Sequence, residues 1–312
     1  MTNKEKNFVS AVIYVHNAEK NIDEFLKMII NVMEENFEHS EIICVNDSSD
    51  DKSLSIISNV SRIATSTSIS VINMSYFHGI ELSMNAGVDL AIGDFVFEFD
   101  NTISDFEPSV IMSVYRRALE GYDIVSASPD RKERFSSKLF YKVFELYSQL
   151  SQKMSTETFR VLSRRVINKI NSMSKMTPYR KAMYINCGLK VDNIKYKITN
   201  SKQGRLNRKD RKYRSSIAVE SLILFTEMGY SFSKLMTVIM MLISIFMVVY
   251  SVVVYATSNP VAGWTTTILF LSVAFFGLFG ILTIVVRYLQ ILVNLVFKRK
   301  HYSFESIEKI TK

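Results

Sequence analysis

The chain has 312 residues, of which 48% are hydrophobic, and a formal net charge of +8. This length allows one large domain or two small ones. The two isolated cysteines, Cys44 and Cys187, predict packed thiols rather than a disulfide or a metal site, so we expect neither redox nor zinc chemistry.

Strand-like and helical patterns alternate through the first hundred residues. The apolar run at residues 8–15 ends in His16-Asn17 without a small-residue cleavage pattern, so it predicts a strand and not a signal peptide. The elements expected next are a helix at 21–35, a strand at 41–46, a helix at 52–63, a strand at 70–74, a helix at 81–91 and a strand at 94–99. This alternation predicts a mostly parallel sheet with right-handed crossovers.

Ligands of open α/β sheets usually bind beyond the carboxyl ends of the strands. Residues 16–17, 47–49, 75–79 and 100 follow the predicted strands. Asp47, Asp94 and Asp100 are the acidic residues close to strand ends, and we expect the three to converge.

Asp100 predicts a site for Mg²⁺ or Mn²⁺ bound together with a nucleotide diphosphate. Magnesium takes only one or two protein carboxylates and completes its shell with phosphate and water. Asn101 and Thr102 add only neutral oxygens, so the ion would be held weakly or only with nucleotide present. Two structural alternatives remain open, in which Asp100 ends a strand at a turn and Asp47 caps the helix near Lys52.

After Pro108 the pattern becomes helical. Residues 135–150 carry an apolar stripe on one side and Lys138 and Lys142 on the other. Such a helix fits a bilayer surface and a protein core equally well. A second amphipathic candidate, residues 215–232, leads into the first of two long apolar runs.

Residues 235–255 and 265–286 contain no charged side chain, and each run is long enough to cross a hydrocarbon core of roughly 30 Å. A buried helix pair of a soluble protein is the alternative. Basic residues lie before the first run and after the second: Lys202, Arg205, Arg208, Lys209, Arg211, Lys212, Arg214, Lys298, Arg299 and Lys300. The positive-inside bias therefore predicts a cell-membrane protein with two spans and both termini in the cytoplasm.

The expected organisation has four parts. They are a cytoplasmic domain at 1–200, a basic juxtamembrane and amphipathic segment at 201–232, a transmembrane hairpin at 233–297 and a basic cytoplasmic tail at 298–312. We expect the lipid bilayer and no nucleic acid among the partners. Gly277 and Gly280 in the second span leave a homo-oligomer open, because small residues permit close helix contacts.

Four segments in this order resemble the family 2 glycosyltransferases with a GT-A fold, and among them the polyprenyl-phosphate sugar transferases with two carboxyl-terminal transmembrane helices. Residues 10–19 resemble the opening strand and its Tyr-Asn-Glu-Glu turn, and residues 41–51 the second strand and its Asp-Asp-Gly-Ser-x-Asp loop. Residues 86–94 resemble the helix and turn before the Asp-x-Asp motif. Residues 159–166 resemble the Phe-Arg-Leu-x-Ser-Arg-Arg-Val segment.

The resemblance implies a GT-A, Rossmann-like α/β fold, with a mostly parallel sheet and helices on both faces. It also implies inverting transfer of a sugar from a nucleotide sugar to a polyprenyl phosphate such as undecaprenyl phosphate, for cell-surface glycan synthesis. The implied donor contacts are Val15, Asn17, Glu19, Asp47, Ser49 and Asp100. Asp100 and Arg160 would be catalytic, and Asp100 and Thr102 would bind the metal. Candidate lipid-phosphate contacts are Arg131, Arg134, Arg205, Arg208 and Lys212.

Several acidic positions of the family pattern are changed in this chain. Ala18, Asn46, Thr102 and Thr158 stand where the family usually has Glu or Asp. A catalytically silent relative that acts as a membrane-bound binding or assembly partner is therefore the alternative function. A transferase whose acceptor is a growing glycan ranks last, because two spans are few to line a channel.

Overall fold

The computed structural model describes residues 4–131, 142, 156–173, 180–199, 228–257, 261, 263–296 and 303–311. The chain divides into two compact units. The first combines Met1–Ala218 with Arg299–Lys312, and the second is Val219–Lys298.

The first unit is built on an eight-stranded sheet with the strand order β7-β5-β6-β4-β1-β2-β3-β8. The strands are β1 (Val9–Val15), β2 (Ser40–Asn46), β3 (Ser68–Met74), β4 (Phe95–Phe99), β5 (Ile124–Pro129), β6 (Phe159–Ser163), β7 (Val191–Tyr196) and β8 (Phe304–Lys309). Neighbours among β1 to β4 are parallel, which confirms the predicted parallel sheet. In the β1–β2 register Val15 lies beside Asn46, so these two strands end at the same edge.

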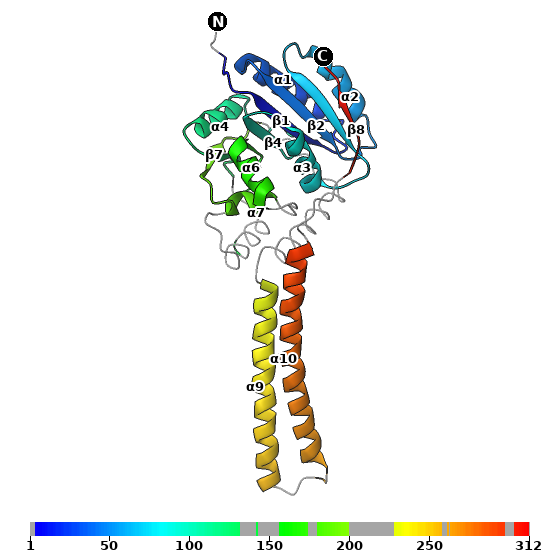
Figure 1. The fold of residues 1–312 in the computed structure, drawn as a ribbon, viewed down its shortest axis with the longest axis vertical. Coiled ribbons are helices and arrows are strands. Elements are labelled where there is room, and N and C mark those ends of the chain that lie inside the picture. The colour runs from blue at the N-terminus through cyan, green and yellow to red at the C-terminus, as the bar shows by residue number, and fades with distance from the viewer. Residues whose placement is uncertain are drawn as a thin grey trace. The chain divides into compact units, whose positions relative to one another are not determined.

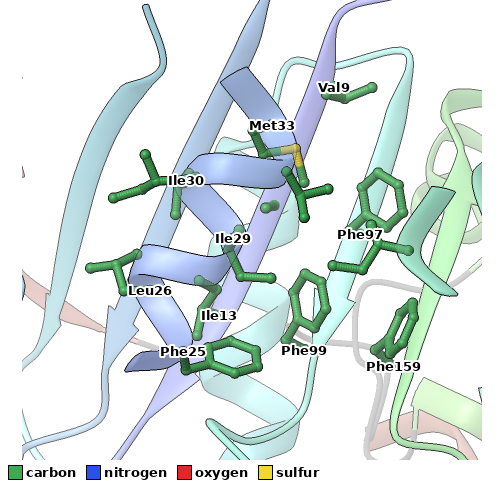
Figure 2. Packing of buried hydrophobic residues seen from close by; sticks show 14 of the residues in the cluster. Val9, Ile13, Phe25, Leu26, Ile29, Ile30, Met33, Phe97, Phe99 and Phe159 are labelled. Atoms are coloured by element: carbon green, nitrogen blue, oxygen red, sulfur yellow. The ribbon is translucent and has the colours of Figure 1, made fainter. Parts of the chain in front are cut away.

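Helices cover both faces of the sheet, as expected. Helices α1 (Ile22–Asn36), α2 (Ser53–Val60) and α4 (Ser109–Leu119) contribute to one buried cluster, and α3 (Ile80–Leu90), α6 (Arg164–Met173) and α7 (Arg180–Asn186) to the other. Figure 2 shows the first cluster, in which Phe25 of α1 points toward Phe99 of β4. Their rings meet edge to face with centroids 5.5 Å apart. Alternate β1 residues serve the two faces, because side chains alternate along a strand.

The region after Pro108 differs from the helical prediction. Helix α4 is present, but β5, β6 and β7 complete one half of the sheet. Strand β6 is antiparallel to both β4 and β5. These strands are five or six residues long, so they offer too little periodicity to be distinguished from helix. The amphipathic candidate at 135–150 lies outside the described residues except for Lys142, which is helical.

The carboxyl-terminal tail contains a strand that the sequence analysis did not predict. Strand β8 is antiparallel to β3 at the sheet edge (Figure 1). The Ile310 amide donates to the Ile69 carbonyl at 2.9 Å, and the Ile69 amide donates to the Thr311 hydroxyl at 2.7 Å. Side chains along β8 are largely exposed, so main-chain bonds position this strand without an apolar pattern in its sequence.

The second unit is an antiparallel helix pair, α9 (Met228–Thr257) and α10 (Trp264–Val296) (Figure 1). The windows Ser231–Thr257 and Trp264–Leu289 are long and apolar enough to cross a membrane, with mean hydropathies of 2.6 and 2.7. The hydroxyl groups of Thr237 and Thr283 form a hydrogen bond between the helices. A Cβ added at Gly280 would lie 3.4 Å from the Met241 methyl group, so this glycine faces α9.

Candidate functional site

Two loops interlock at the carboxyl edge of β1 and β2. The Asp47 amide donates to the Val15 carbonyl at 2.8 Å, and the Asn17 amide donates to the Ser49 hydroxyl at 3.1 Å. The Glu19 amide donates to a carboxylate oxygen of Asp51 at 2.9 Å. The structure thus brings together the predicted donor contacts of the two loops.

Asp47 is fully buried at this edge and holds the next loop in place. Its carboxylate accepts the backbone N–H groups of His78 and Gly79, both at 2.8 Å, and the Tyr14 hydroxyl at 2.9 Å. These amides directly precede α3, so Asp47 stabilises the start of that helix. The alternative in which Asp47 caps the helix near Lys52 is wrong. At the start of that helix, α2, it is Asp51 that accepts the Ser53 amide, at 3.0 Å.

Aromatic side chains lie beside Asp47. His16 Nδ1 is 2.7 Å from the Asp47 carbonyl oxygen, and the His16 and Phe77 rings have centroids 4.7 Å apart. Tyr76 stacks on His78 with a centroid distance of 4.0 Å and remains 61% exposed. The loop that Asp47 holds therefore presents an aromatic surface to solvent.

Asp94 does not join this edge, which corrects the expectation that three acids converge. Its carboxylate accepts the Phe8 amide at 3.1 Å, just before β1 begins. In the β1–β4 register Val9 lies beside Phe95, so Asp94 precedes β4 at the amino edge. The physical reason is that Asp94 comes before its strand, whereas Asp47 and Asp100 come after theirs.

Asp100 is held by two guanidinium groups. Arg160 Nη2 donates to one carboxylate oxygen at 2.8 Å, and Arg180 Nη2 donates to the other at 2.7 Å. The Asp100 side chain is 21% exposed, whereas those of Arg160 and Arg180 are 4% and 2% exposed. The acid lies toward solvent and the two bases lie beneath it.

The same arginines bind Glu98, whose side chain has no exposed surface. Arg160 Nη1 and Arg180 Nη1 each donate to a different Glu98 oxygen at 2.8 Å. The Tyr184 hydroxyl also donates to Glu98, at 2.6 Å. We call Glu98, Asp100, Arg160 and Arg180 the arginine cluster.

Two further acids complete the surroundings of the arginine cluster. Glu81 of α3 accepts from Arg180 Nε at 3.1 Å, and Glu157 accepts from Arg160 Nε at 3.0 Å. Burial opposes the charge of Arg180, but the nearby carboxylates of Glu98, Asp100 and Glu81 hold its pKa well above the ordinary value. Burial raises the pKa of Tyr184, and the adjacent Glu98 carboxylate raises it further. The cluster therefore keeps both arginines charged and Tyr184 protonated.

These residues do not fit a divalent cation at Asp100. Both Asp100 oxygens already accept hydrogen bonds from guanidinium groups, and Thr102 offers only a hydroxyl on a side chain that is 6% exposed. Among the described residues, no group of three or more His, Cys, Asp or Glu side chains is arranged to hold a metal ion. Mg²⁺ and Mn²⁺ need only one or two protein carboxylates when phosphate and water complete the shell. The misfit therefore rests on the two guanidinium charges, which lie 2.7–2.8 Å from the Asp100 oxygens and repel a cation there.

The family model described as glycosyl transferase family 2 matches residues 10–184, which include both interlocked loops and the arginine cluster. The chain belongs to glycosyl transferase family 2. The expected resemblance is therefore confirmed, and it extends over the whole parallel half of the sheet.

Two curated relatives and one solved structure illustrate the similarity. An uncharacterized glycosyltransferase of Synechocystis sp. is 30% identical over 182 residues, which are 56% of each chain. A prophage bactoprenol glucosyl transferase homolog of Escherichia coli is 29% identical over 196 residues, 60% of this chain and 62% of the relative. The matched region thus spans less than two thirds of these relatives.

The solved structure is mannosyl-3-phosphoglycerate synthase from Rubrobacter xylanophilus. It has a TM-score of 0.51 and 18% sequence identity, over 70% of this chain and 73% of that chain. At this identity the likeness concerns the fold, and it confirms the predicted GT-A-like architecture.

Within this family 2 domain, sequence reasoning missed Glu81, Glu98, Arg180 and Tyr184. Glu98 carried a usable signal, because it stands among apolar residues at 95–99 and a buried acid needs a partner. Arg160, within the apolar strand β6, carried the matching signal. Nothing in the sequence around Arg180 indicated its contacts with Glu98 and Asp100, because these depend on how α7 packs in the folded domain.

The predicted lipid-phosphate contacts of the family 2 chain are placed only in part. Arg131 is exposed and follows β5. The others, Arg134, Arg205, Arg208 and Lys212, lie outside the described residues. Their role stays a prediction.

Proposed function

We propose that this family 2 chain is a membrane-bound, inverting glycosyltransferase. It moves a sugar from a nucleotide-sugar donor to a polyprenyl phosphate such as undecaprenyl phosphate, for cell-surface glycan synthesis or modification. The observation that carries the proposal is one chain that joins a family 2 domain to two apolar helices long enough to cross a bilayer. The similarity to a bactoprenol glucosyl transferase homolog favours a lipid acceptor.

The donor would bind at the carboxyl edge of β1 and β2. The loops there contribute Asn17, Glu19 and Ser49, and Asp47 holds the aromatic loop at 75–79 beside them. Loops positioned by a rigid sheet commonly carry binding residues. The chain's role in this site is to orient the donor against the acceptor, which can lower a barrier substantially without covalent chemistry.

A lipid phosphate is a suitable nucleophile for a site with few free acids. Phosphate is already anionic at neutral pH, so it need not lose a proton to a general base before it attacks the anomeric carbon. Asp47 and Asp100, two of the acids at this edge, are both occupied by hydrogen bonds. This acceptor chemistry therefore demands positioning and charge neutralisation more than proton transfer.

The strand β8 favours both ends of the chain lying on one side of the membrane. The sheet contains β1 to β7 from before the helix pair and β8 from after it. Two crossings by α9 and α10 return the chain to its starting side. The basic residues that flank the hairpin favour the cytoplasmic side.

The test uses the full-length protein in liposomes that contain undecaprenyl phosphate, supplied with a panel of nucleotide sugars. We expect one donor to yield a glycosylated lipid, detected by mass spectrometry. Undecaprenol without the phosphate is the matched control and should stay unmodified. The proposal fails if a folded preparation forms no glycolipid with any donor.

The second candidate is a silent relative that acts as a binding or assembly partner. It is favoured by the pairing of both Asp100 oxygens and by Thr102 at the second acidic position. Calorimetric titration with UDP and GDP separates the candidates, because a transferase must bind its donor nucleotide and a silent partner need not. Product on an added oligosaccharide instead of the lipid would identify a glycan acceptor.

A further inference from the structure

The four charges of the arginine cluster balance one another, and the flanking acids Glu81 and Glu157 add negative charge beside the two arginines. Glu98 and Asp100 contribute two negative charges, and Arg160 and Arg180 contribute two positive charges. The four ion pairs have N···O distances of 2.7–2.8 Å. Each arginine bridges the two acids, so each acid receives a guanidinium N–H on both oxygens.

A bound cation at this edge would pair with the Asp100 carboxylate and would also neutralise the donor diphosphate. The arginine cluster fills the first role, because both Asp100 oxygens are bound by guanidinium groups. It supplies no net positive charge for the second, which other basic groups must provide. Arginine is well suited to the first role, because its planar guanidinium stays charged and binds carboxylates through more than one N–H.

The arginines cannot easily leave Asp100 to admit a metal. Their side chains are 4% and 2% exposed, so a withdrawn guanidinium has little solvent to enter. Glu98 is fully buried, and movement of either arginine would leave it with an unmatched charge. Removing one partner of a buried ion pair is strongly unfavourable, because it leaves the other charge buried and uncompensated.

We propose that this chain handles its nucleotide donor without a divalent cation at Asp100, because Arg160 and Arg180 permanently neutralise Glu98 and Asp100. Arg160 and Arg180 are positioning residues that act through the two carboxylates. The part that concerns the donor rests on the proposed function. The part that concerns the cation stands on the geometry of the cluster.

The first experiment measures Mn²⁺ binding to full-length protein in detergent micelles, both alone and with UDP or GDP, by electron paramagnetic resonance of the free ion. We expect wild type and Asp100→Asn to bind Mn²⁺ equally or not at all. Asp105→Asn is the matched control, since Asp105 lies in the loop after β4 and accepts a hydrogen bond from Tyr196 at 2.7 Å. Mn²⁺ binding by wild type that Asp100→Asn weakens about tenfold or more overturns the proposal.

A gain-of-function variant tests the stated cause. Thr102→Asp with Arg180→Gln restores the second acid and frees one Asp100 oxygen, so it should bind Mn²⁺ about tenfold or more tightly than wild type. Circular dichroism reports whether this variant folds. If it does not fold, the wild-type comparison still decides the proposal.

The second experiment titrates wild type with UDP and GDP by calorimetry, once with EDTA and once with Mn²⁺. We expect dissociation constants that agree within about twofold in the two buffers, since no cation is needed at the site. Nucleotide binding only with Mn²⁺ overturns the proposal. If neither nucleotide binds in either buffer, the proposed donor function fails, and the paramagnetic resonance result alone decides the cation proposal.

Discussion

Glu98 and Arg160 lie directly opposite each other on the antiparallel strands β4 and β6 and form an ion pair of 2.8 Å. Their side chains are 0% and 4% exposed. Opposite residues in such a ladder are close neighbours, so strand register alone brings these charges together. The pair belongs to the packing of the sheet as much as to the candidate site.

Loss of Arg160 should destabilise the domain strongly. Arg160→Met leaves the buried Glu98 with only Arg180 as a charged partner, and we expect the free energy of unfolding to fall by about 3–5 kcal/mol. Arg165→Met is the control, because Arg165 is 74% exposed and lies 3.9 Å from Asp123, so its loss should change stability by less than about 1 kcal/mol. Urea denaturation of both variants measures this, and equal effects would contradict a structural role for Arg160.

Asp47→Asn should weaken the start of α3. The asparagine side chain keeps one accepting oxygen for the amides of His78 and Gly79, so we expect a loss of about 1–3 kcal/mol. The exposed neighbour Asp50 offers a control, and Asp50→Asn should change stability by less than about 0.5 kcal/mol. Urea denaturation of both variants measures the difference. The hydrogen-exchange rate of the Gly79 amide should rise in Asp47→Asn and stay unchanged in Asp50→Asn.

Removal of β8 should expose the edge of β3. A chain that stops after residue 302 loses the Thr311 acceptor of the Ile69 amide and the Ser303 carbonyl that accepts from Ser75 at 3.3 Å. We expect both amides to exchange faster with deuterium, as read by mass spectrometry of the intact and shortened chains. Glu305→Ala keeps the β8 backbone and should leave their exchange unchanged. Unaltered exchange in the shortened chain would refute the pairing.

Gly87→Ala should disturb the contact between α3 and the sheet. An added Cβ would lie 2.4 Å from Val12 Cγ1 and 2.7 Å from Val45 Cγ2, distances that require neighbouring atoms to move. Overpacking of this kind lowers stability by about 1–3 kcal/mol. Asn85→Ala on the same helix is the control and should be neutral or slightly stabilising, because alanine favours helix. Thermal melting of both variants tests the difference.

Alkaline pH should destabilise the domain partly through Cys44. Burial raises the pKa of this thiol from 9.0 to about 12, so the unfolded chain loses the proton at a lower pH than the folded one. This stability contribution is present below pH 9 and is lost as the pH rises toward 12. The free energy of unfolding should therefore be lower at pH 10 than at neutral pH by about 1.4 kcal/mol. Urea denaturation at pH 7 and pH 10 should show a smaller pH dependence for Cys44→Ala, and identical pH dependence would contradict the assignment.

Periodicity predicted the parallel half of the sheet correctly, from β1 to β4 with α1, α2 and α3 between them. The apolar runs at 235–255 and 265–286 likewise predicted the two long helices. These patterns are local, since each element buries one face and the spacing of apolar residues within the element shows which face is buried. The same reasoning did not predict β8, because its side chains are largely exposed and do not follow a buried-face pattern.

The amino-acid sequence by itself determined the fold family, the two apolar helices and the presence of acids beside strand ends, because spacing along the chain specifies these features. Only the tertiary structure decided what the acids do. Asp94 lies at the opposite edge, Asp47 holds α3, and Asp100 is bound by Arg160 and Arg180. Arg180 is 80 residues from Asp100 in the chain, and only the packing of α7 against the sheet brings their charges together.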